Sequence, residues 1–336
     1  MTARGRLAAA SCLAAVAAVA AGTGAFASAT SNPPPKPPIP AYGQGELKGV
    51  ATEFTDPTGE PPGVVNRPCT PAAAHPYPVV LVHGTFANEN FSWQTLAPML
   101  SDAGYCVYGF NYGATSWTTY SGNHTFGADA VEHSAAQLAT FIKTVVVPDT
   151  KATEVDLVGH SQGGMMPRYM IDATGNHAYP GLGQASLVHT LVGLAPSNQG
   201  TTFGGLVTLF GFFGNSEYTF AAQGGCGACG EQESGSPFLK ALNFHPDASG
   251  PNYYVLETSQ DEVVTPYTNA FLPRDKNALN VTLQTQCPTD LTEHLGIIYD
   301  PVALQDVMAA LANNSTHVKA LPKPICPPLV LPGVSG

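Results

Sequence analysis

The chain has few charged residues. Only 11% of its 336 residues are Asp, Glu, Lys or Arg, and 24 acidic residues outnumber 13 basic ones, for a formal net charge of −11. This acidic balance argues against nucleic acids and strongly anionic surfaces as partners. Hydrophobic residues make up 44% of the chain, so it has ample material for a folded core.

The sequence also lacks a long apolar run of the kind that spans a membrane. Its N-terminal apolar stretch, residues 7–21, is short for a spanning helix and consists mostly of alanine. The stretch follows Arg4 and Arg6 and precedes the small residues 27–29. This order is typical of a secretory signal peptide, so residues 1–29 are predicted to be removed and the mature protein to be secreted. Cleavage would take away two basic residues and no acidic ones, changing the net charge from −11 to −13.

Cysteine is scarce as well. Of seven cysteines, Cys12 lies in the predicted signal peptide, which leaves six in the mature chain. An even number in a secreted protein indicates disulfides, and six cysteines allow 15 pairings. Cys226 and Cys229 form a C-x-x-C pair with no further zinc ligands at suitable spacing nearby, so a small loop-closing disulfide is expected there.

What the chain does contain is a short apolar run, residues 155–158, followed by Gly159-His160-Ser161-Gln162-Gly163. The run fits a buried parallel strand, and the pentad has the G-x-S-x-G form of a nucleophile elbow. A serine in a sharp strand-to-helix turn takes a strained backbone conformation, and glycines let the strand and the helix approach closely. A helix beginning at Gln162 would direct its free N–H groups toward the serine. On the pentad alone, an ordinary tight turn with a solvated serine remains open.

Buried strands and amphipathic helices alternate along the chain. This alternation predicts crossover connections, a mostly parallel sheet with helices on both faces, and hence an α/β fold. The pentad would lie at the carboxyl end of a strand, where open α/β sheets hold their ligands. The predicted strands are residues 78–83, 105–110, 155–158, 188–194, 253–257 and 280–283, the predicted helices are residues 92–100, 128–146, 162–171 and 301–311, and residues 111–126 are predicted to form a loop.

Two segments fall outside this alternation. Residues 30–45 are rich in proline and are predicted to be an extended linker, which leaves residues 46–336 for one catalytic domain. Residues 196–241 form a long insertion between two strands, and insertions of this length are usually lids or binding loops. The apolar run at residues 203–213 within it has two interpretations, a substrate-facing surface or packing beneath the domain.

A serine nucleophile needs a base, and the base needs an acid that orients it. Asp261 follows the strand 253–257, and His294 follows the last strand, which gives the Ser–Asp–His chain order of α/β-hydrolases. Glu262 is the neighbouring alternative, although its side chain should point away from that of Asp261. The other candidates are set aside, because Asp290 and Asp300 come too late in the chain and His245 and His317 are predicted to be surface residues.

The segment His83-Gly84-Thr85 ends the strand 78–83, which should lie beside the elbow strand. It is either an ordinary strand-end turn or part of an oxyanion hole built from the Thr85 and Gln162 backbone N–H groups. The Thr85 hydroxyl is a candidate third donor, whereas the side chains of His160 and Gln162 are predicted to be structural. The predicted chemistry needs no metal and no organic cofactor.

At these motifs the chain resembles the secreted bacterial class 2 lipases and esterases of the α/β-hydrolase superfamily. The matching segments are Val80-Leu81-Val82-His83-Gly84-Thr85, Gly159-His160-Ser161-Gln162-Gly163-Gly164, Asp261-Glu262-Val263-Val264-Thr265-Pro266 and Glu293-His294. The resemblance implies a catalytic triad of Ser161, Asp261 and His294, with oxyanion donors at Thr85 and Gln162.

The chain is also similar, more distantly, to the fungal lipase B type. In that type one disulfide flanks the first strand and another ties the histidine loop to the C-terminal tail. The likeness implies the pairs Cys69–Cys106 and Cys287–Cys326, leaving Cys226 with Cys229. Some bacterial lipases hold calcium near the histidine loop, but the spacing of Asp290 and Asp300 does not match, so no metal site is predicted.

Together these features predict a secreted, triacylglycerol lipase-like serine carboxylester hydrolase that acts on lipid acyl esters, with the lipid interface a candidate place of action. A monomer is expected, with no nucleic-acid partner and no membrane span after signal cleavage. A short-chain or polymer carboxylesterase or an acyltransferase would use the same triad. A different alternative is a catalytically silent binding protein on the same scaffold.

Overall fold

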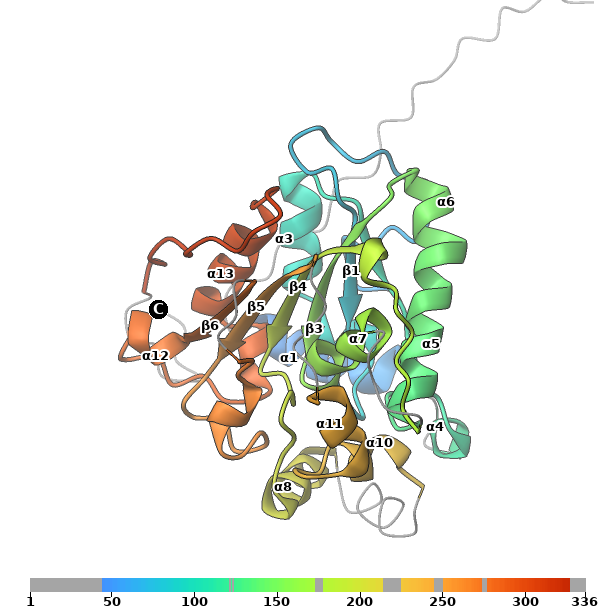
Figure 1. The fold of residues 1–336 in the computed structure, drawn as a ribbon, viewed down its shortest axis with the longest axis vertical. Helices are drawn as coiled ribbons and strands as arrows, with labels where there is room; N and C mark the ends of the chain where they lie inside the picture. Colours follow the sequence, from blue (N-terminus) through green and yellow to red (C-terminus); the bar gives the residue numbers. More distant parts are fainter. Residues whose placement is uncertain are drawn as a thin grey trace, which may run out of the picture. The chain divides into compact units, whose positions relative to one another are not determined.

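The computed structural model describes residues 44–120, 122, 124–172, 178–213, 225–244, 250–273 and 277–326. The predicted signal peptide, most of the predicted linker and His245 lie outside these residues. The centre is a six-stranded sheet in which every pairing is parallel, in the order β2-β1-β3-β4-β5-β6 (Figure 1). The strands are β1 Val79–Val82, β2 Val107–Gly109, β3 Val155–His160, β4 Val188–Leu194, β5 Asn252–Glu257 and β6 Ala278–Thr282.

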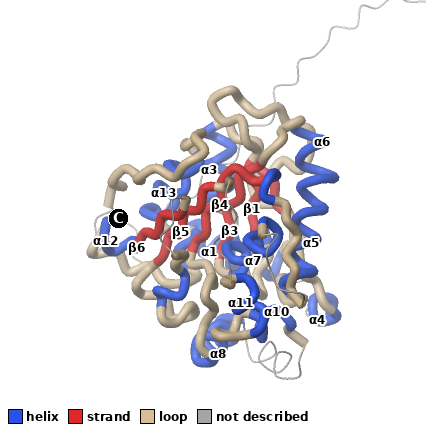
Figure 2. The backbone as a smooth tube through the Cα atoms, in the orientation of Figure 1, coloured by secondary structure: helices blue, strands red, loops and turns tan. Residues whose placement is uncertain are grey.

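Helices cover both faces of this sheet (Figures 1 and 2). Side chains alternate along a strand, so in β1 Val80 and Val82 join one core with α5 and α7, while Val79 and Leu81 join another with α3 and α13. The predicted mostly parallel α/β sheet is therefore confirmed. The helices packed on the sheet are α3 Leu96–Ala103, α5 Val131–Phe141, α7 Gln162–Ile171 and α13 Pro301–Leu311.

The remaining helices are short or lie around the ends of the strands. In Figure 1, α8, α10 and α11 gather beyond one end of the sheet. The longer ones are α1 Gln44–Thr55 and α8 Phe203–Phe213, and the short ones are α2 Glu89–Ser92, α4 Ser116–Tyr120, α6 Val147–Thr150, α10 Gly227–Glu231, α11 Pro237–Leu242 and α12 Leu283–Gln286. Short 3₁₀ segments occur at η2 Ala185–Leu187, η3 Tyr267–Ala270 and η4 Gly296–Ile298. No helix in the described ranges is long and apolar enough to cross a bilayer.

Several boundaries differ from the sequence-based expectation. The helix expected at residues 92–100 is two helices, α2 and α3, and Asn88 rather than Ser92 caps the first by accepting from the Phe91 N–H at 2.8 Å. The helix expected at residues 128–146 begins later and continues through a π-helical segment, η1 Ile142–Val146. The predicted loop at residues 111–126 contains α4, and the last two residues of the predicted linker belong to α1.

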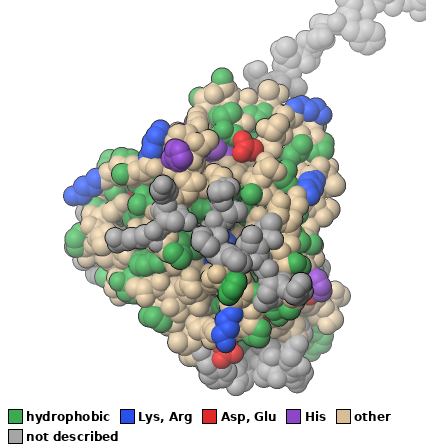
Figure 3. All heavy atoms as spheres, viewed as in Figure 1, with side chains coloured by type: hydrophobic (Ala, Val, Ile, Leu, Met, Phe, Trp, Pro, Cys, Tyr) green, Lys and Arg blue, Asp and Glu red, His purple; other side chains and the backbone are tan. Residues whose placement is uncertain are grey.

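The apolar helix α8 is buried on one side, as the packing interpretation expects, and exposed on the other, while the substrate-facing interpretation stays a prediction. Leu206, Leu209 and Phe210 are buried against the core, while Val207 and Phe212 are 41% and 45% exposed. Elsewhere, on the face drawn in Figure 3, charged side chains are few and lie apart among apolar and uncharged polar ones.

Three disulfides join Cys69 to Cys106, Cys226 to Cys229, and Cys287 to Cys326. These are the pairs that the resemblance to the fungal lipase B type implied. The third bond ties the C-terminal tail to the segment just after α12, close in sequence to His294.

The disulfides should differ in their effect on stability. The bonded cysteines of the third bond are 39 residues apart in sequence and those of the second only 3. A longer closed loop restricts the unfolded chain more, so Cys287→Ser with Cys326→Ser should lower the free energy of unfolding by about 2–4 kcal/mol. The double variant Cys226→Ser with Cys229→Ser should lower the free energy of unfolding by clearly less. Denaturant titration of the two double variants checks this, and equal losses would contradict the loop-length argument.

Candidate active site

Ser161 lies in the turn between β3 and α7, with a backbone φ of 53° and ψ of −122°. This region is strained for a residue with a side chain. The strand and the helix approach so closely that a Cβ at Gly159 would lie 1.8 Å from the Gly163 carbonyl oxygen. A Cβ at Gly163 would lie 2.2 Å from the Val82 carbonyl oxygen. Only glycine fits at both positions, which accounts for the G-x-S-x-G pattern.

The candidate acid and base contact each other directly. His294 Nδ1 lies 2.8 Å from Asp261 Oδ2, and both side chains are fully buried. The second carboxylate oxygen of Asp261 accepts hydrogen bonds from the backbone N–H groups of Val263 and Val264, at 2.8 and 2.7 Å. No such contact joins Glu262 to His294 among the described residues. Asp261 is therefore held on both oxygens, with one of them facing the imidazole.

His160 brings His294 close to the elbow. It immediately precedes Ser161, its Nε2 donates to the His294 carbonyl oxygen at 2.8 Å, and the two rings lie 4.8 Å apart between centroids. Burial lowers the pKa of His160 to about 3, so its ring stays neutral and acts as a spacer. Because Nδ1 of His294 faces Asp261, its proton-accepting atom is Nε2, which is buried and has no hydrogen-bond partner in the part of the chain described.

The electrostatic environment of the pair favours a basic imidazole. Burial alone would lower the pKa of His294, but the charge and hydrogen bond of Asp261, aided by Glu262 and Glu293, raise it above its ordinary value. Burial alone would likewise raise the pKa of Asp261, yet His294 and the two backbone donors hold it below its usual range. Asp261 is thus an ionised carboxylate although it is buried.

Sequence reasoning missed a second buried carboxyl group, which interacts with Asp261. Glu257, the last residue of β5, is fully buried and accepts from the Thr258 N–H at 2.7 Å. Burial, followed by the negative charge of Asp261, raises its pKa well above the ordinary value, so Glu257 is neutral beside an ionised Asp261. The signal in the sequence is a glutamate ending an otherwise apolar strand.

The two candidate oxyanion donors come from two segments close to the serine. Thr85 follows β1 and Gln162 begins α7, and neither backbone N–H has a hydrogen-bond partner among residues 44–120 and 124–172 or the other described ranges. A Cβ at Gly84 would lie 3.2 Å from the Ser161 Cβ, so the Thr85 loop passes close to the nucleophile. The Thr85 hydroxyl itself donates to Gln162 Oε1 at 2.8 Å, which engages its single proton, and its role as a third donor stays a prediction.

The other acidic and histidine candidates lie elsewhere. Asp300 caps α13 by accepting from the Val302 and Ala303 N–H groups, both at 2.8 Å, and Asp290 accepts from the Thr292 N–H at 2.9 Å. His317 is exposed, with Nδ1 3.3 Å from Asn277 Oδ1. Within the described ranges, no group of three or more His, Cys, Asp or Glu side chains is arranged to hold a metal ion.

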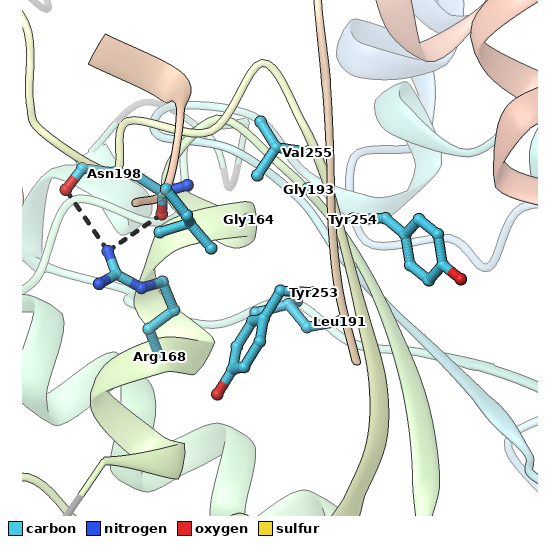
Figure 4. Close-up of a pocket in the computed structure, with 9 residues that line it drawn as sticks. Gly164, Arg168, Leu191, Gly193, Asn198, Tyr253, Tyr254 and Val255 are labelled. Atoms are coloured by element: carbon cyan, nitrogen blue, oxygen red, sulfur yellow. Dashed lines mark hydrogen bonds between the residues drawn. The ribbon is translucent and has the colours of Figure 1, made fainter. Parts of the chain in front are cut away.

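A small pocket behind α7 is separate from this constellation (Figure 4). It is too narrow for a water molecule, and its main polar group, the buried Arg168, donates to Asn198 Oδ1 at 3.2 Å and to Asn243 Oδ1 at 2.8 Å. The pocket is therefore a packing gap around a satisfied cation rather than a ligand site. It is lined by Gly164, Arg168, Leu191, Gly193, Asn198, Tyr253, Tyr254, Val255 and Leu272.

A parallel sheet with a serine elbow after β3, an acid after β5 and a histidine after β6 defines the class of α/β-hydrolases. The structure is similar to that of lipase B from Aspergillus fumigatus, with a TM-score of 0.55 and 17% identity over 74% of this chain and 56% of that one. Residues 76–306 match the family model described as lipase (class 2), and the chain belongs to that family.

Two curated relatives are triacylglycerol lipases, from Pseudarthrobacter phenanthrenivorans and Burkholderia plantarii. Each is 33% identical to this chain over 103 residues, which is 29% of the chain. The match spans 29% of the length of the first relative and 26% of the second.

The raised pKa of His294 predicts the pH dependence of catalysis. The imidazole must be neutral to accept a proton, so kcat/KM should fall as the pH drops through a pKa above the ordinary 6.5. Glu257→Gln should leave this profile and the rate nearly unchanged, because an amide replaces a carboxyl group that is already neutral. Profiles of kcat/KM against pH for both proteins check this. A large loss of rate in Glu257→Gln would mean that Glu257 acts as an anion.

Proposed function

We propose that this protein is a secreted serine hydrolase that cleaves lipid acyl esters through an acyl-enzyme on Ser161. The observation that carries the proposal is the buried hydrogen bond between His294 and Asp261, at 2.8 Å, beside a serine held in a strained turn. A buried carboxylate, a histidine with its other nitrogen unpaired and two free backbone N–H groups are the parts that acyl transfer needs.

The mechanism follows from these positions. His294 Nε2 takes the Ser161 hydroxyl proton while the oxygen attacks the ester carbonyl carbon, and the Thr85 and Gln162 N–H groups donate to the oxyanion. When the tetrahedral intermediate collapses, the C–O bond to the alcohol breaks and His294 gives its proton to the leaving alcohol. Water then attacks the acyl-enzyme with the same base, which releases the carboxylic acid and restores Ser161. Asp261 stabilises the imidazolium in both halves of the reaction.

The surroundings of the serine favour an apolar acyl group. Phe86 directly follows Thr85, and its ring lies 5.6 Å from that of Phe210 on α8. On the other side, α8 lies against the loop after Asp261, because a Cβ at Gly205 would be 2.0 Å from the Val263 carbonyl oxygen. The apolar helix α8 thus bridges the oxyanion loop and the acid loop. Ser161 is only 3% exposed, so the serine lies beneath the side chains around it.

Secretion is supported by the N-terminal sequence pattern and by the three disulfides, which persist in oxidising compartments. The lipase relatives support a lipid ester as the substrate. A short-chain esterase would use the same parts, as would a polymer esterase or an acyltransferase, and a silent binding protein would keep the scaffold without turnover.

Substitutions in the proposed triad should separate an enzyme from a silent scaffold. Ser161→Ala should lower kcat by about 10⁶-fold, and Asp261→Asn by about 10⁴-fold because the imidazole loses its orientation and charge partner. Hydrolysis of a p-nitrophenyl ester measures both losses, and a fluorophosphonate probe should label the wild-type protein but not Ser161→Ala. A wild-type protein that neither turns over esters nor takes the label would favour the binding protein.

The ester preference has its own measurement. If α8 borders an acyl pocket, rates on p-nitrophenyl esters should rise from acetyl to octanoyl or longer chains, and an emulsified triacylglycerol should be hydrolysed. Rates that fall beyond short acyl chains, with no hydrolysis of the emulsion, would assign the protein to the short-chain esterases instead.

A further inference from the structure

A glutamine from the long insertion reaches the oxyanion loop. Gln232 directly follows α10, is 3% exposed, and lies 147 residues from Thr85 in sequence, yet its Nε2 lies 2.8 Å from the Thr85 hydroxyl oxygen. The rest of the carboxamide is paired as well. Its Nε2 also donates to the Ala228 carbonyl oxygen at 3.1 Å, and its Oε1 accepts from the Ser197 hydroxyl at 2.9 Å.

These contacts fix the direction of every proton in the chain of hydrogen bonds. The Ala228 carbonyl oxygen can only accept, so the end of the Gln232 side chain that contacts it is the Nε2 amide, and this same amide faces Thr85 and donates to it. The Thr85 oxygen must therefore accept from Gln232. The single hydroxyl proton of Thr85 is then free to donate to Gln162 Oε1, at 2.8 Å. The hydrogen bonds run in one direction, from Gln232 to Thr85 and from Thr85 to Gln162. Thr85 and Gln162 are the two residues whose backbone N–H groups are the candidate oxyanion donors.

Gln232 is itself firmly held. The Cys226–Cys229 disulfide closes α10, whose Ala228 carbonyl accepts from the Gln232 side chain. α10 is anchored to the start of α5, where the Glu231 carboxyl oxygen accepts from the Val131 N–H at 2.7 Å. The hydrogen bonds on Thr85 thus originate in a braced element and not in a free loop.

We infer that Gln232 is a positioning residue of the oxyanion hole. It holds the Thr85 hydroxyl in the orientation that links Thr85 to Gln162, and so fixes the spacing of their two backbone N–H groups around the oxyanion. This inference rests on the proposed function and extends it, because it assigns to the insertion a part in transition-state stabilisation. It also assigns the Thr85 hydroxyl to positioning and not to direct donation.

The test compares Gln232→Met, Thr85→Val and the double variant. Methionine and valine keep the approximate volume of the residues they replace and remove the polar contact. Displaced oxyanion donors act on the transition state and not on substrate binding, so each single variant should lower kcat roughly 10- to 100-fold, with KM changed by less than about threefold. The double variant should lose no more than the worse single variant, because both changes break one chain of hydrogen bonds.

Two further variants serve as controls. Gln94→Met replaces another buried glutamine, whose Nε2 donates to the Asn90 carbonyl oxygen at 2.8 Å without contacting Thr85. It should keep kcat within about twofold even where it lowers the melting temperature, since it lies outside the chain of hydrogen bonds. Thr85→Ser retains the hydroxyl and should keep most of the activity that Thr85→Val loses. If Gln232→Met does not fold, Ser197→Ala takes its place, because it removes the hydroxyl that pairs with Gln232 Oε1 and should lower kcat with KM little changed.

The rate of Ser161 labelling by a fluorophosphonate gives a second readout, because phosphonylation also places an oxygen in the oxyanion hole. It should fall by the same factor as kcat in Gln232→Met and in Thr85→Val. Wild-type kcat in Gln232→Met, or losses that add in the double variant, would overturn the inference while the proposed function stands. A loss in Thr85→Val alone would make its hydroxyl a direct donor. An unreactive wild-type Ser161 would instead overturn the proposed function.

Discussion

The close approach of β3 and α7 at Ser161 is the constraint on which the rest of the site depends. A non-glycine residue at φ 53° and ψ −122° costs on the order of 1–3 kcal/mol, and it persists only where its surroundings hold it. Here the Ser161 N–H donates to the Leu194 carbonyl oxygen at 2.9 Å, which ties the turn to the neighbouring strand β4. With the turn fixed, the free N–H at the start of α7 and the serine oxygen keep a constant relation to each other.

Hydrogen bonding then decides which of two buried carboxyl groups near the end of β5 carries a charge. Asp261 and Glu257 belong to the same strand end, and burial pushes the pKa of both carboxyl groups upward. Asp261 receives His294 and two backbone N–H groups and ionises, whereas Glu257 receives a backbone N–H and remains neutral. A second anion there would repel the Asp261 carboxylate, and a protonated Glu257 avoids that repulsion. The opposite protonation states of the two groups follow from their unequal hydrogen bonding.

The features that could be predicted from the sequence are those with a local signature. The apolar run before Ser161 indicates a buried strand, and chain order together with position after a strand selects Asp261 over Asp290 and Asp300. Features that depend on contacts between distant segments could not be predicted in this way. Glu257 looked like the end of an apolar strand, and Gln232 lies in a segment without periodicity, 147 residues from the hydroxyl that it contacts. The partners of the Thr85 hydroxyl could not be predicted either, because they come from α7 and from the insertion.

The insertion is consequently divided into two parts with different attachments. The part around α10 is held by a disulfide, by the hydrogen bond of Glu231 to α5 and by the carboxamide of Gln232, so it belongs to the fixed frame of the site. The helix α8 rests on apolar contacts of Leu206, Leu209 and Phe210 and still exposes Val207 and Phe212. Apolar contacts are non-directional and are replaceable by an acyl chain, whereas a directed chain of hydrogen bonds is not. Within the described residues, the oxyanion loop is thus tied by hydrogen bonds to the part of the insertion around α10, whereas α8 is attached through apolar contacts.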